Sequence, residues 1–225
     1  MTSRRGEYLD ALGLRAYVPR VPLPLGSPPP RPVAADSQGL DWDELELAVR
    51  DCRRCALCGT RTQTVFGVGA RDARLLVVGE APGAEEDRQG EPFVGRAGQL
   101  LNSVLRAAGF GREQVFIANI LKCRPPDNRD PLPAEVEQCL PYLERQIELV
   151  RPALLLCVGR IAAQNLLRTD VTIGRLRGRV HRLASGLPVV VTYHPAYLLR
   201  SPGEKRKVWD DLKLAMGVLR DGHGA

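Results

Sequence analysis

The stretch LLVVGEAPGAEED (75–87) decides the fold class. LLVVGE (75–80) is the continuous apolar run of a strand buried on both faces, and the turn after it leads into an acidic, helix-like segment. The same alternation recurs along the chain. Further strands are predicted at 115–120, 153–159 and 188–193, and helices at 95–109, 133–150, 160–167 and 204–219. Strands that alternate with helices predict an α/β domain whose parallel sheet is covered on both faces.

The composition sets broad limits on function. A chain of 225 residues that is 44% hydrophobic and 26% charged suits one globular domain. We find no apolar run near the length of a membrane span and no signal-peptide pattern, so we expect no membrane partner and a cytoplasmic location. In that compartment six cysteines indicate metal binding or burial rather than disulfides. The net charge of +6 agrees with a polyanionic partner, although solvated surface charge explains it equally well.

The N-terminal region differs in composition from the rest. Residues 18–35, VPRVPLPLGSPPPRPVAA, hold too many prolines for a helix or a central strand and indicate an extended linker. We therefore expect an N-terminal arm over 1–38 and a folded domain over 39–225. A short helix at 40–52 should lead into the first cysteines, and Pro141 should interrupt or kink a later helix.

Polar groups follow the carboxyl ends of the predicted strands. Glu80 comes directly after the first strand, Asn119 ends the second, and His194 follows the fourth. In open α/β sheets ligands bind at this edge. The sequence therefore predicts a site where a carboxylate, an amide and an imidazole converge. The neighbouring acidic run 85–87 fits a simpler role, which is to complement the dipole of a helix.

Two loops near this edge offer candidate nucleic-acid contacts. Phe93 stands in a loop framed by proline and glycine, where it either stacks on a base or packs into the core. After His194, a predicted loop carries apolar residues that suit a wedge into a DNA duplex, beside a basic residue for a phosphate. These residues are Tyr197, Leu198, Leu199 and Arg200. The alternative is that the leucines begin a helix and pack inward.

The cysteines suggest a metal centre. A C-x2-C pair, a cysteine after the second strand and one on the following helix make a plausible four-thiolate set, which suits zinc or an iron–sulfur cluster. These four are Cys52, Cys55, Cys123 and Cys139. Cys58 extends the first pair into part of a ferredoxin-like run that lacks its fourth cysteine, and Cys157 lies mid-strand as a small core residue.

Four motifs together resemble a known family. They are GEAPG (79–83), PFVGRAGQLL (92–101), ANILKCRPPDNR (118–129) and HPAYLLR (194–200). In this order they resemble the family 4 uracil-DNA glycosylases, which carry a [4Fe–4S] cluster, and the resemblance covers roughly 45–219. It implies a three-layer α/β/α sandwich with a four-stranded parallel sheet. It also implies a monofunctional base excision repair enzyme that flips uracil out of DNA, hydrolyses the N-glycosidic bond and leaves an abasic site. We expect the protein to be a monomer.

The resemblance assigns roles residue by residue. It makes the four-thiolate set the ligands of a structural cluster and leaves Cys58 and Cys157 outside. His194 would hydrogen-bond uracil O2, and Asn119 would pair with N3–H and O4. Glu80 would orient water or stabilise the sugar cation. The uracil pocket would comprise Gly79, Glu80, Ala81, Phe93, Asn119 and His194, with Asn128 as a further catalytic position.

Turnover is expected rather than a trapped adduct. A related branch that bonds covalently to uracil has a basic, His-containing insertion after the second strand, and 120–133 holds no histidine. A rival interpretation is a metal- or cluster-bearing nucleic-acid-binding module without turnover, for which a converging carboxylate and imidazole have no use. Another is an enzyme of free nucleotides, which would need neither the leucine wedge nor a basic surface.

The N-terminal segment MTSRRGEYLDALGLRAYVPR (1–20) lies outside this resemblance. Its leucines and tyrosines at semi-helical spacing resemble the N-terminal peptide of the psi subunit of bacterial DNA polymerase III, which docks on the clamp loader. The hypothesis is a tether through residues 1–25 that brings repair to the replisome. The competing interpretation is a disordered or self-packing tail.

Overall fold

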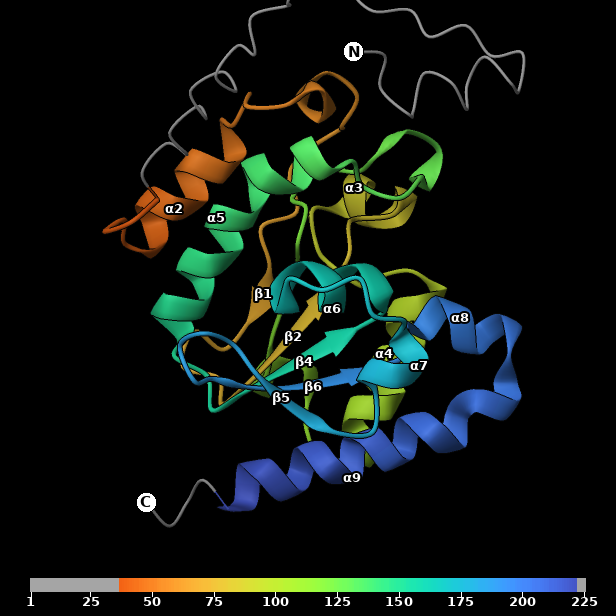
Figure 1. The fold of residues 1–225 in the computed structure, drawn as a ribbon. Helices are drawn as coiled ribbons and strands as arrows, with labels where there is room; N and C mark the ends of the chain where they lie inside the picture. The colour runs from red at the N-terminus through yellow and green to blue at the C-terminus, as the bar shows by residue number, and fades with distance from the viewer. Residues whose placement is uncertain (1–36, 222–225) are drawn as a thin grey trace, which may run out of the picture. The chain divides into compact units, whose positions relative to one another are not determined.

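The computed structural model describes residues 37–221 (Figure 1). The expected clamp-loader contact at 1–25 lies outside the described residues, as does the expected arm over 1–38 except for Ser37 and Gln38.

A parallel sheet forms the centre of the described domain. Its four parallel strands are β2 (Leu75–Gly79), β3 (Phe116–Asn119), β4 (Leu154–Val158) and β6 (Pro188–Thr192), in the spatial order β3-β2-β4-β6. The four-stranded parallel sheet is therefore confirmed. Two short antiparallel strands extend its edges, β1 (Val68–Gly69) beside β3 and β5 (Val180–Arg182) beside β6. These edge strands were not predicted, because two or three residues carry no alternating pattern.

The predicted long helices all form, with ends shifted by a few residues at most. The helices are α2 (Trp42–Arg50), α3 (Ala84–Gln89), α4 (Arg96–Ala107), α5 (Pro133–Val150), α6 (Arg160–Leu167), α7 (Ile173–Leu176), α8 (Pro195–Arg200) and α9 (Lys205–Asp221). Pro141 was expected to interrupt or kink its helix; interruption is wrong, since α5 runs through Pro141, and a kink stays a prediction. Within residues 37–221, no helix is both long and apolar enough to cross a bilayer.

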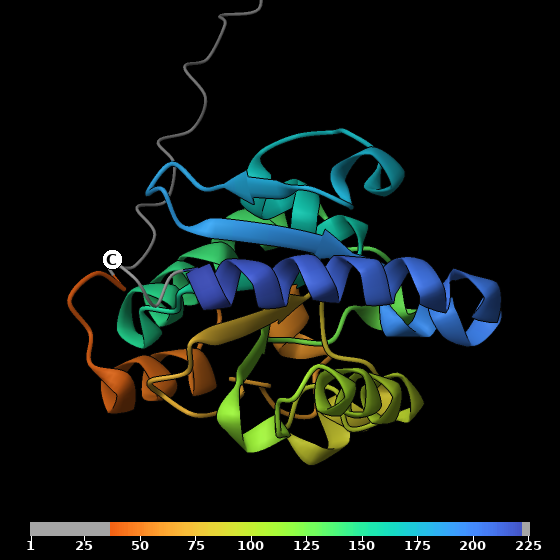
Figure 2. The same ribbon diagram turned by 90° about the horizontal axis from the view of Figure 1, so that it is seen from below.

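Successive residues of the parallel strands point into two separate cores. Leu76 and Val78 pack in the core that includes α2, α5 and α6, whereas Leu75 and Val77 pack in the core that includes α4, α8 and α9. Figure 2 shows α9 running across one face of the sheet, where it contacts β6 and β4. Helices on both faces of one sheet make the expected three-layer α/β/α sandwich, and both faces of the strands are apolar for this reason.

Candidate active site and cysteine pocket

A cleft of about 510 Å³ opens at the carboxyl edge of the parallel strands. Gly79 and Asn119 are register partners in β2 and β3, so the chain leaves both strands at one level. Most residues that the sequence singled out line this cleft, namely Glu80, Ala81, Phe93, Asn119, Asn128, His194, Tyr197 and Arg200. A volume of this size accommodates a small organic ligand.

The Phe93 ring is held at the wall of the cleft by its loop. Its backbone is left-handed, with φ of 55°, a conformation that costs free energy for a residue with a side chain. The Glu86 carboxylate stabilises the loop by accepting from the N–H groups of Val94 and Gly95, each at 3.0 Å. The ring itself lies 5.7 Å from the His194 ring. The ring is buried among core residues, so the core-packing alternative holds, and stacking on a base stays a prediction.

The role of Glu86 in this loop was missed from the sequence. The acidic run 85–87 suggested only an interaction with the helix dipole. Glu85 does form an i,i+3 ion pair with Arg88, at 2.7 Å. Asp87, in contrast, is buried and accepts from the N–H of Thr62, at 3.0 and 3.1 Å. The sequence could not tell the roles of these three acidic residues apart, because Glu86 and Asp87 accept from backbone N–H groups of other loops.

Asn119 places an unpaired acceptor in the cleft. The residue is 2% exposed, and its Oδ1 atom has no hydrogen-bond partner. A buried amide oxygen without a donor destabilises the folded state by about 1–3 kcal/mol. Such an atom at a cleft wall is an acceptor prepared for a ligand N–H.

Gly79 provides the space that this arrangement needs. A Cβ atom at Gly79 would lie 2.3 Å from Asn119 Oδ1 and 2.6 Å from Phe93 Cζ. We expect Gly79→Ala to displace both side chains and to lower ligand turnover in the cleft by at least about 10²-fold, because such displacements approach 1 Å. Steady-state kinetics measures this loss. Gly217→Ala, on an open face of α9, is the matched control and should leave turnover unchanged.

The His194 imidazole is held as a neutral hydrogen-bond donor. His194 is the N-cap of α8, and its Nδ1 atom accepts from the N–H of Ala196 at 3.1 Å. An Nδ1 acceptor leaves the proton on Nε2. Burial lowers the pKa of His194 to about 4, with a further contribution from Arg200, so the ring is neutral at physiological pH. The ring therefore offers the cleft an Nε2–H donor.

Glu80 stands in an environment that favours its protonated form. Burial raises the pKa of Glu80 to about 7, and the Asp130 carboxylate adds to this effect while Arg160 opposes it. Asp130 itself pairs with Arg160 at 2.6 Å. A carboxyl group with a pKa near 7 suits proton transfer or charge stabilisation at physiological pH. Asp130 and Arg160 were missed from the sequence, because they approach Glu80 only in the folded chain.

The expected leucine loop is a helix, so one predicted DNA contact is wrong. Residues Pro195–Arg200 form α8, and Leu198 is 1% exposed in the core with α4 and α9. Tyr197 and Leu199 are 36% and 40% exposed. The inward-packing alternative therefore holds for Leu198, because a helix turns neighbouring leucines to different sides.

Asn128 lies at the cleft wall in a short 3-10 helix, Pro126–Asn128. Its Oδ1 atom accepts from Arg124 Nε at 2.8 Å, so this oxygen is already engaged within the loop. Asn128 and Arg124 thus form a pair that rigidifies the loop beside the cleft.

A second pocket brings distant cysteines together. Its wall includes the four cysteines of the proposed ligand set, which come from the segment after α2, the segment after β3 and from α5. Cys58 lines the same pocket, although the resemblance leaves it outside the ligand set. Cys157 lies elsewhere, fully buried in β4 as expected of a core residue.

Cationic groups surround these cysteines. Arg61 donates to Cys123 Sγ at 3.0 Å, and the buried Lys122 also lines the pocket. The Nη1 and Nη2 atoms of Arg54 are buried there without a hydrogen-bond partner. Among residues 37–221, no carboxylate lines the pocket. Such a lining fits an anionic metal–thiolate centre, because cations and N–H donors stabilise thiolates. The two free Nη donors of Arg54 are available to such an anion.

The spacing of the cysteines does not favour a single ion. Within residues 37–221, no group of three or more His, Cys, Asp or Glu side chains is spaced to hold one metal ion. In an iron–sulfur cluster each cysteine binds its own iron, so the four sulfur atoms need not meet at one point. Burial raises the pKa of Cys139 to about 12, and a bound metal would be needed to keep it deprotonated.

Comparisons with known proteins agree with this geometry. A model of the uracil DNA glycosylase superfamily matches residues 66–213. The chain is 46% identical over 178 residues to the type-4 uracil-DNA glycosylase of Archaeoglobus fulgidus, and the aligned region covers 76% of this chain and 89% of that protein. It is 41% identical over 175 residues to the type-4 uracil-DNA glycosylase of Thermotoga maritima, and the aligned region covers 76% of this chain and 91% of that protein. The chain therefore belongs to the uracil DNA glycosylase superfamily and, within it, to the type-4 uracil-DNA glycosylases.

Proposed function

We propose that the protein removes uracil from DNA by hydrolysing the N-glycosidic bond, as the first step of base excision repair. The observation that carries this proposal is the unpaired Oδ1 atom of Asn119, buried in the same cleft as Glu80, Phe93 and His194. The cleft thus offers an acceptor, a donor and an aromatic wall to a planar base. The names of the relatives support the same substrate and reaction.

Recognition of the base follows from hydrogen-bond complementarity. In uracil, N3–H is a donor and O4 an acceptor, which match the Oδ1 and Nδ2 atoms of Asn119. Cytosine has an acceptor at N3 and a donor at N4. It would therefore set an acceptor against Asn119 Oδ1 and a donor against Nδ2. Sites that bury such hydrogen-bonding groups favour the matching substrate over the mismatched one by several orders of magnitude in kcat/KM. Phe93 would stack against the ring of the flipped base.

The chemistry requires stabilisation of charge on both sides of the breaking bond. The electron pair of the C1′–N1 bond leaves with uracil as an anion, the oxygen of a water molecule bonds to C1′, and the proton that the water loses finally neutralises the released uracil. His194 donates its Nε2–H to uracil O2, where negative charge accumulates. Ionised Glu80 lies on the sugar side, where it orients the water or stabilises the positive charge on the sugar.

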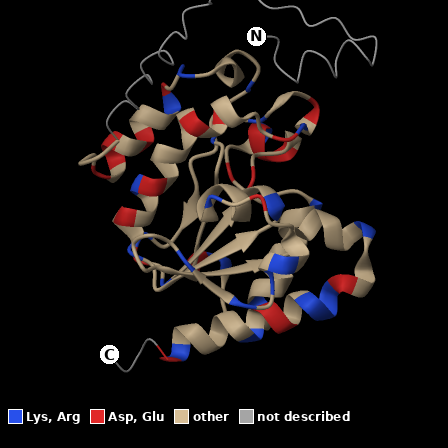
Figure 3. Cartoon of the chain, in the orientation of Figure 1, with Lys and Arg blue, Asp and Glu red and all other residues tan. Residues whose placement is uncertain are grey.

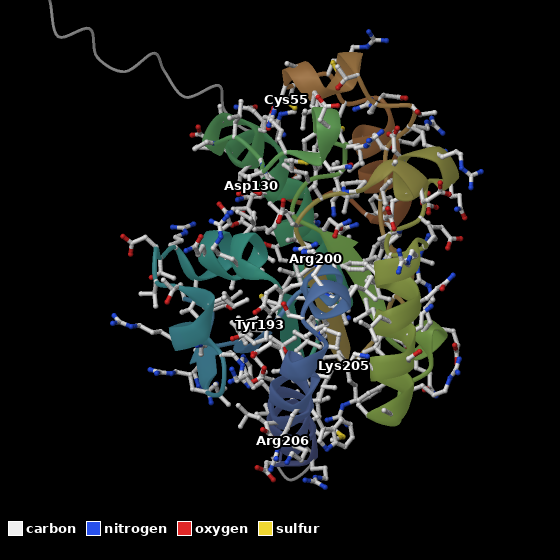
Figure 4. The ribbon with its side chains drawn as sticks, turned by 90° about the vertical axis from the view of Figure 1, so that its right-hand side faces the viewer. Cys55, Asp130, Tyr193, Arg200, Lys205 and Arg206 are labelled. Atoms are coloured by element: carbon white, nitrogen blue, oxygen red, sulfur yellow. The ribbon has the colours of Figure 1, made fainter. Side chains whose placement is uncertain are left out.

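Basic residues near the cleft would hold the DNA backbone. Arg200 lines the cleft, and Lys205 and Arg206 are exposed at the start of α9. Figure 3 shows the basic turns that begin α9, and Figure 4 labels these three residues on one side of the molecule. Tyr197 and Leu199 are exposed nearby on α8 and remain candidates for filling the space that the flipped base leaves.

We also propose that the cysteine pocket holds the [4Fe–4S] cluster that the family resemblance implies, bound by Cys52, Cys55, Cys123 and Cys139. The cationic lining and the two buried Arg54 Nη atoms without a hydrogen-bond acceptor support an anionic guest. When bound, the cluster supplies cross-links between three chain segments rather than chemistry on uracil. Brown protein with about four irons and four sulfides per chain supports this assignment, whereas colourless protein that contains zinc contradicts it.

A cleavage assay tests the proposed function. Uracil-containing oligonucleotides, single- and double-stranded, are incubated with the holoenzyme, and abasic sites are cleaved with alkali. We expect strand breaks only at uracil, with free uracil released, and no release from deoxyuridine monophosphate. Tight binding without release would indicate the binding module instead. Release from the free nucleotide alone would indicate the nucleotide enzyme.

The charge pair next to Glu80 predicts a pH dependence. Activity of the ionised carboxylate rises as pH increases through the pKa of Glu80, which lies at about 7. Asp130→Asn removes a charge that raises this pKa, so the midpoint of the pH profile of kcat/KM, which reports the free enzyme, should move to lower pH. Arg160→Gln removes a charge that lowers it, so the midpoint should move to higher pH. Profiles that shift in the same direction in both variants would refute the assignment of this midpoint to Glu80.

A further inference from the structure

Five buried residues, 119–123, connect the cleft to the cysteine pocket, and we name them the connecting segment. Its first residue lines the cleft, and its last two line the cysteine pocket. The N–H of Ile120 donates to the Gly79 carbonyl and the N–H of Leu121 to the Glu80 carbonyl, each at 3.0 Å. The segment therefore runs beside the residues that carry the catalytic carboxylate.

Lys122 touches both sites at once. Its Nζ atom turns back to donate to the backbone carbonyl of Asn119 at 2.9 Å and to Gln146 Oε1 at 2.6 Å. Its backbone N–H donates to Cys139 Sγ at 3.2 Å. Gln146 is itself fully buried and anchored, since its Nε2 atom donates to the Phe66 carbonyl at 2.9 Å.

The burial of this ammonium group is costly. Lys122 is 1% exposed, and the hydrogen-bond acceptors of its Nζ atom are both neutral. Its countercharges would be thiolates of the cysteine pocket, and even a paired buried charge often stabilises a fold less than apolar side chains of similar volume. Lys122 therefore contributes something that an apolar residue would not, and its hydrogen bonds show what that is. It fixes the carbonyl of Asn119, and with it the backbone that directs the Asn119 side chain.

We propose that Lys122 is a positioning residue for base recognition, which ties the backbone of Asn119 to the wall of the cysteine pocket. This inference rests on the proposed function. It implies that the geometry of the cysteine pocket affects uracil excision through Asn119, even though the pocket takes no part in breaking the bond. When Cys123 and Cys139 are held in place, the backbone of the connecting segment is restrained as far as Asn119, because its two ends lie in the two sites.

The test is a double-mutant cycle in the holoenzyme. Lys122→Met should lower kcat/KM for a uracil oligonucleotide by roughly 10- to 100-fold, because misplacement of a recognition group by a fraction of an ångström has effects of this size. In an Asn119→Ala background the same substitution should change kcat/KM less than about threefold, since its target is already gone. Equal losses in both backgrounds, or no loss from Lys122→Met alone, would overturn the proposal.

A second variant and a second readout guard against misfolding. Gln146→Leu removes one of the two acceptors of Nζ and should show the same cycle with a smaller loss. Lys213→Met makes the same chemical change on the exposed face of α9 and should have no effect. Visible absorption and the Tm of each variant report whether the metal centre and fold are retained.

Amide hydrogen exchange separates this inference from the proposed function. If Lys122 orders the connecting segment, exchange at Ile120 and Leu121 should be faster in Lys122→Met than in the wild type, whether or not uracil is the substrate. Wild-type protein that leaves uracil in DNA would refute the proposed function alone. Unchanged exchange at these two amides would refute the role of Lys122.

Discussion

His194→Ala is expected to lower the rate of uracil excision by about 10²- to 10³-fold, with a smaller effect on DNA binding. The reason is that the Nε2–H donor acts on charge that develops only as the bond breaks, and loss of one such donor from a preorganised site has effects of this size. Single-turnover kinetics with excess enzyme measures the chemical step directly. A proportional loss of DNA affinity, with the chemical step unchanged, would contradict this role.

The neutral form of His194 adds a second observable. Because burial lowers its pKa to about 4, the imidazole should not titrate between pH 5 and 9. The pH profile of kcat/KM should therefore show one rise near pH 7, from Glu80, and no fall that corresponds to loss of a proton from an imidazolium ion. His181→Ala is the matched control, since that half-buried histidine lies on the edge strand β5 and bonds only to the Leu176 carbonyl among the described contacts.

Asn119→Ala is expected to lower kcat/KM for uracil by on the order of 10³-fold and to weaken discrimination against cytosine. Two hydrogen bonds to the base are lost, and the mismatch that rejects cytosine is lost with them. The fold should tolerate the change or gain stability, because the variant no longer buries an unpaired amide oxygen. Thermal unfolding and excision from uracil and cytosine oligonucleotides, measured on the same preparation, test both statements.

The direction of the stability change makes this prediction specific. Asn165→Ala is the matched control on α6, where the side chain donates to the Ile161 carbonyl and the residue does not line the cleft. It should leave excision unchanged and should not raise the Tm. An Asn119→Ala variant that retains wild-type selectivity would show that another group reads the base.

Much of the fold follows from local pattern. The runs at β2 and β4 are apolar at every position and β6 is apolar up to Thr192, which identifies strands buried on both faces. The short edge strands carried no such pattern. The expected loop at 194–200 is the helix α8, for which Pro195 at the first helical position was an available signal. The exposed loop was preferred over the alternative of a helix that packs inward, and the burial of Leu198 shows that the alternative was correct.

The candidate site was predicted in part. Some of its residues can be placed from the order of strands and helices, whereas the roles of others depend on tertiary contacts. Glu80, Asn119 and His194 follow strands, so their convergence was predictable from the order of elements alone. The effect of Asp130 and Arg160 on the pKa of Glu80 was not, because these residues are far apart in the sequence. Glu86 was misassigned for the same reason, since its partners are backbone N–H groups of another loop.

The sequence by itself determined the α/β class, the edge of the sheet that carries the site and the four cysteines of the proposed ligand set. Only the tertiary structure showed that Lys122 is buried between the two pockets, that Asn119 has a free acceptor and that His194 is a neutral donor. The physical reason is one of range. Periodicity along the chain reports which side chains are apolar together, whereas hydrogen bonds and pKa values depend on groups that meet only when the chain has folded.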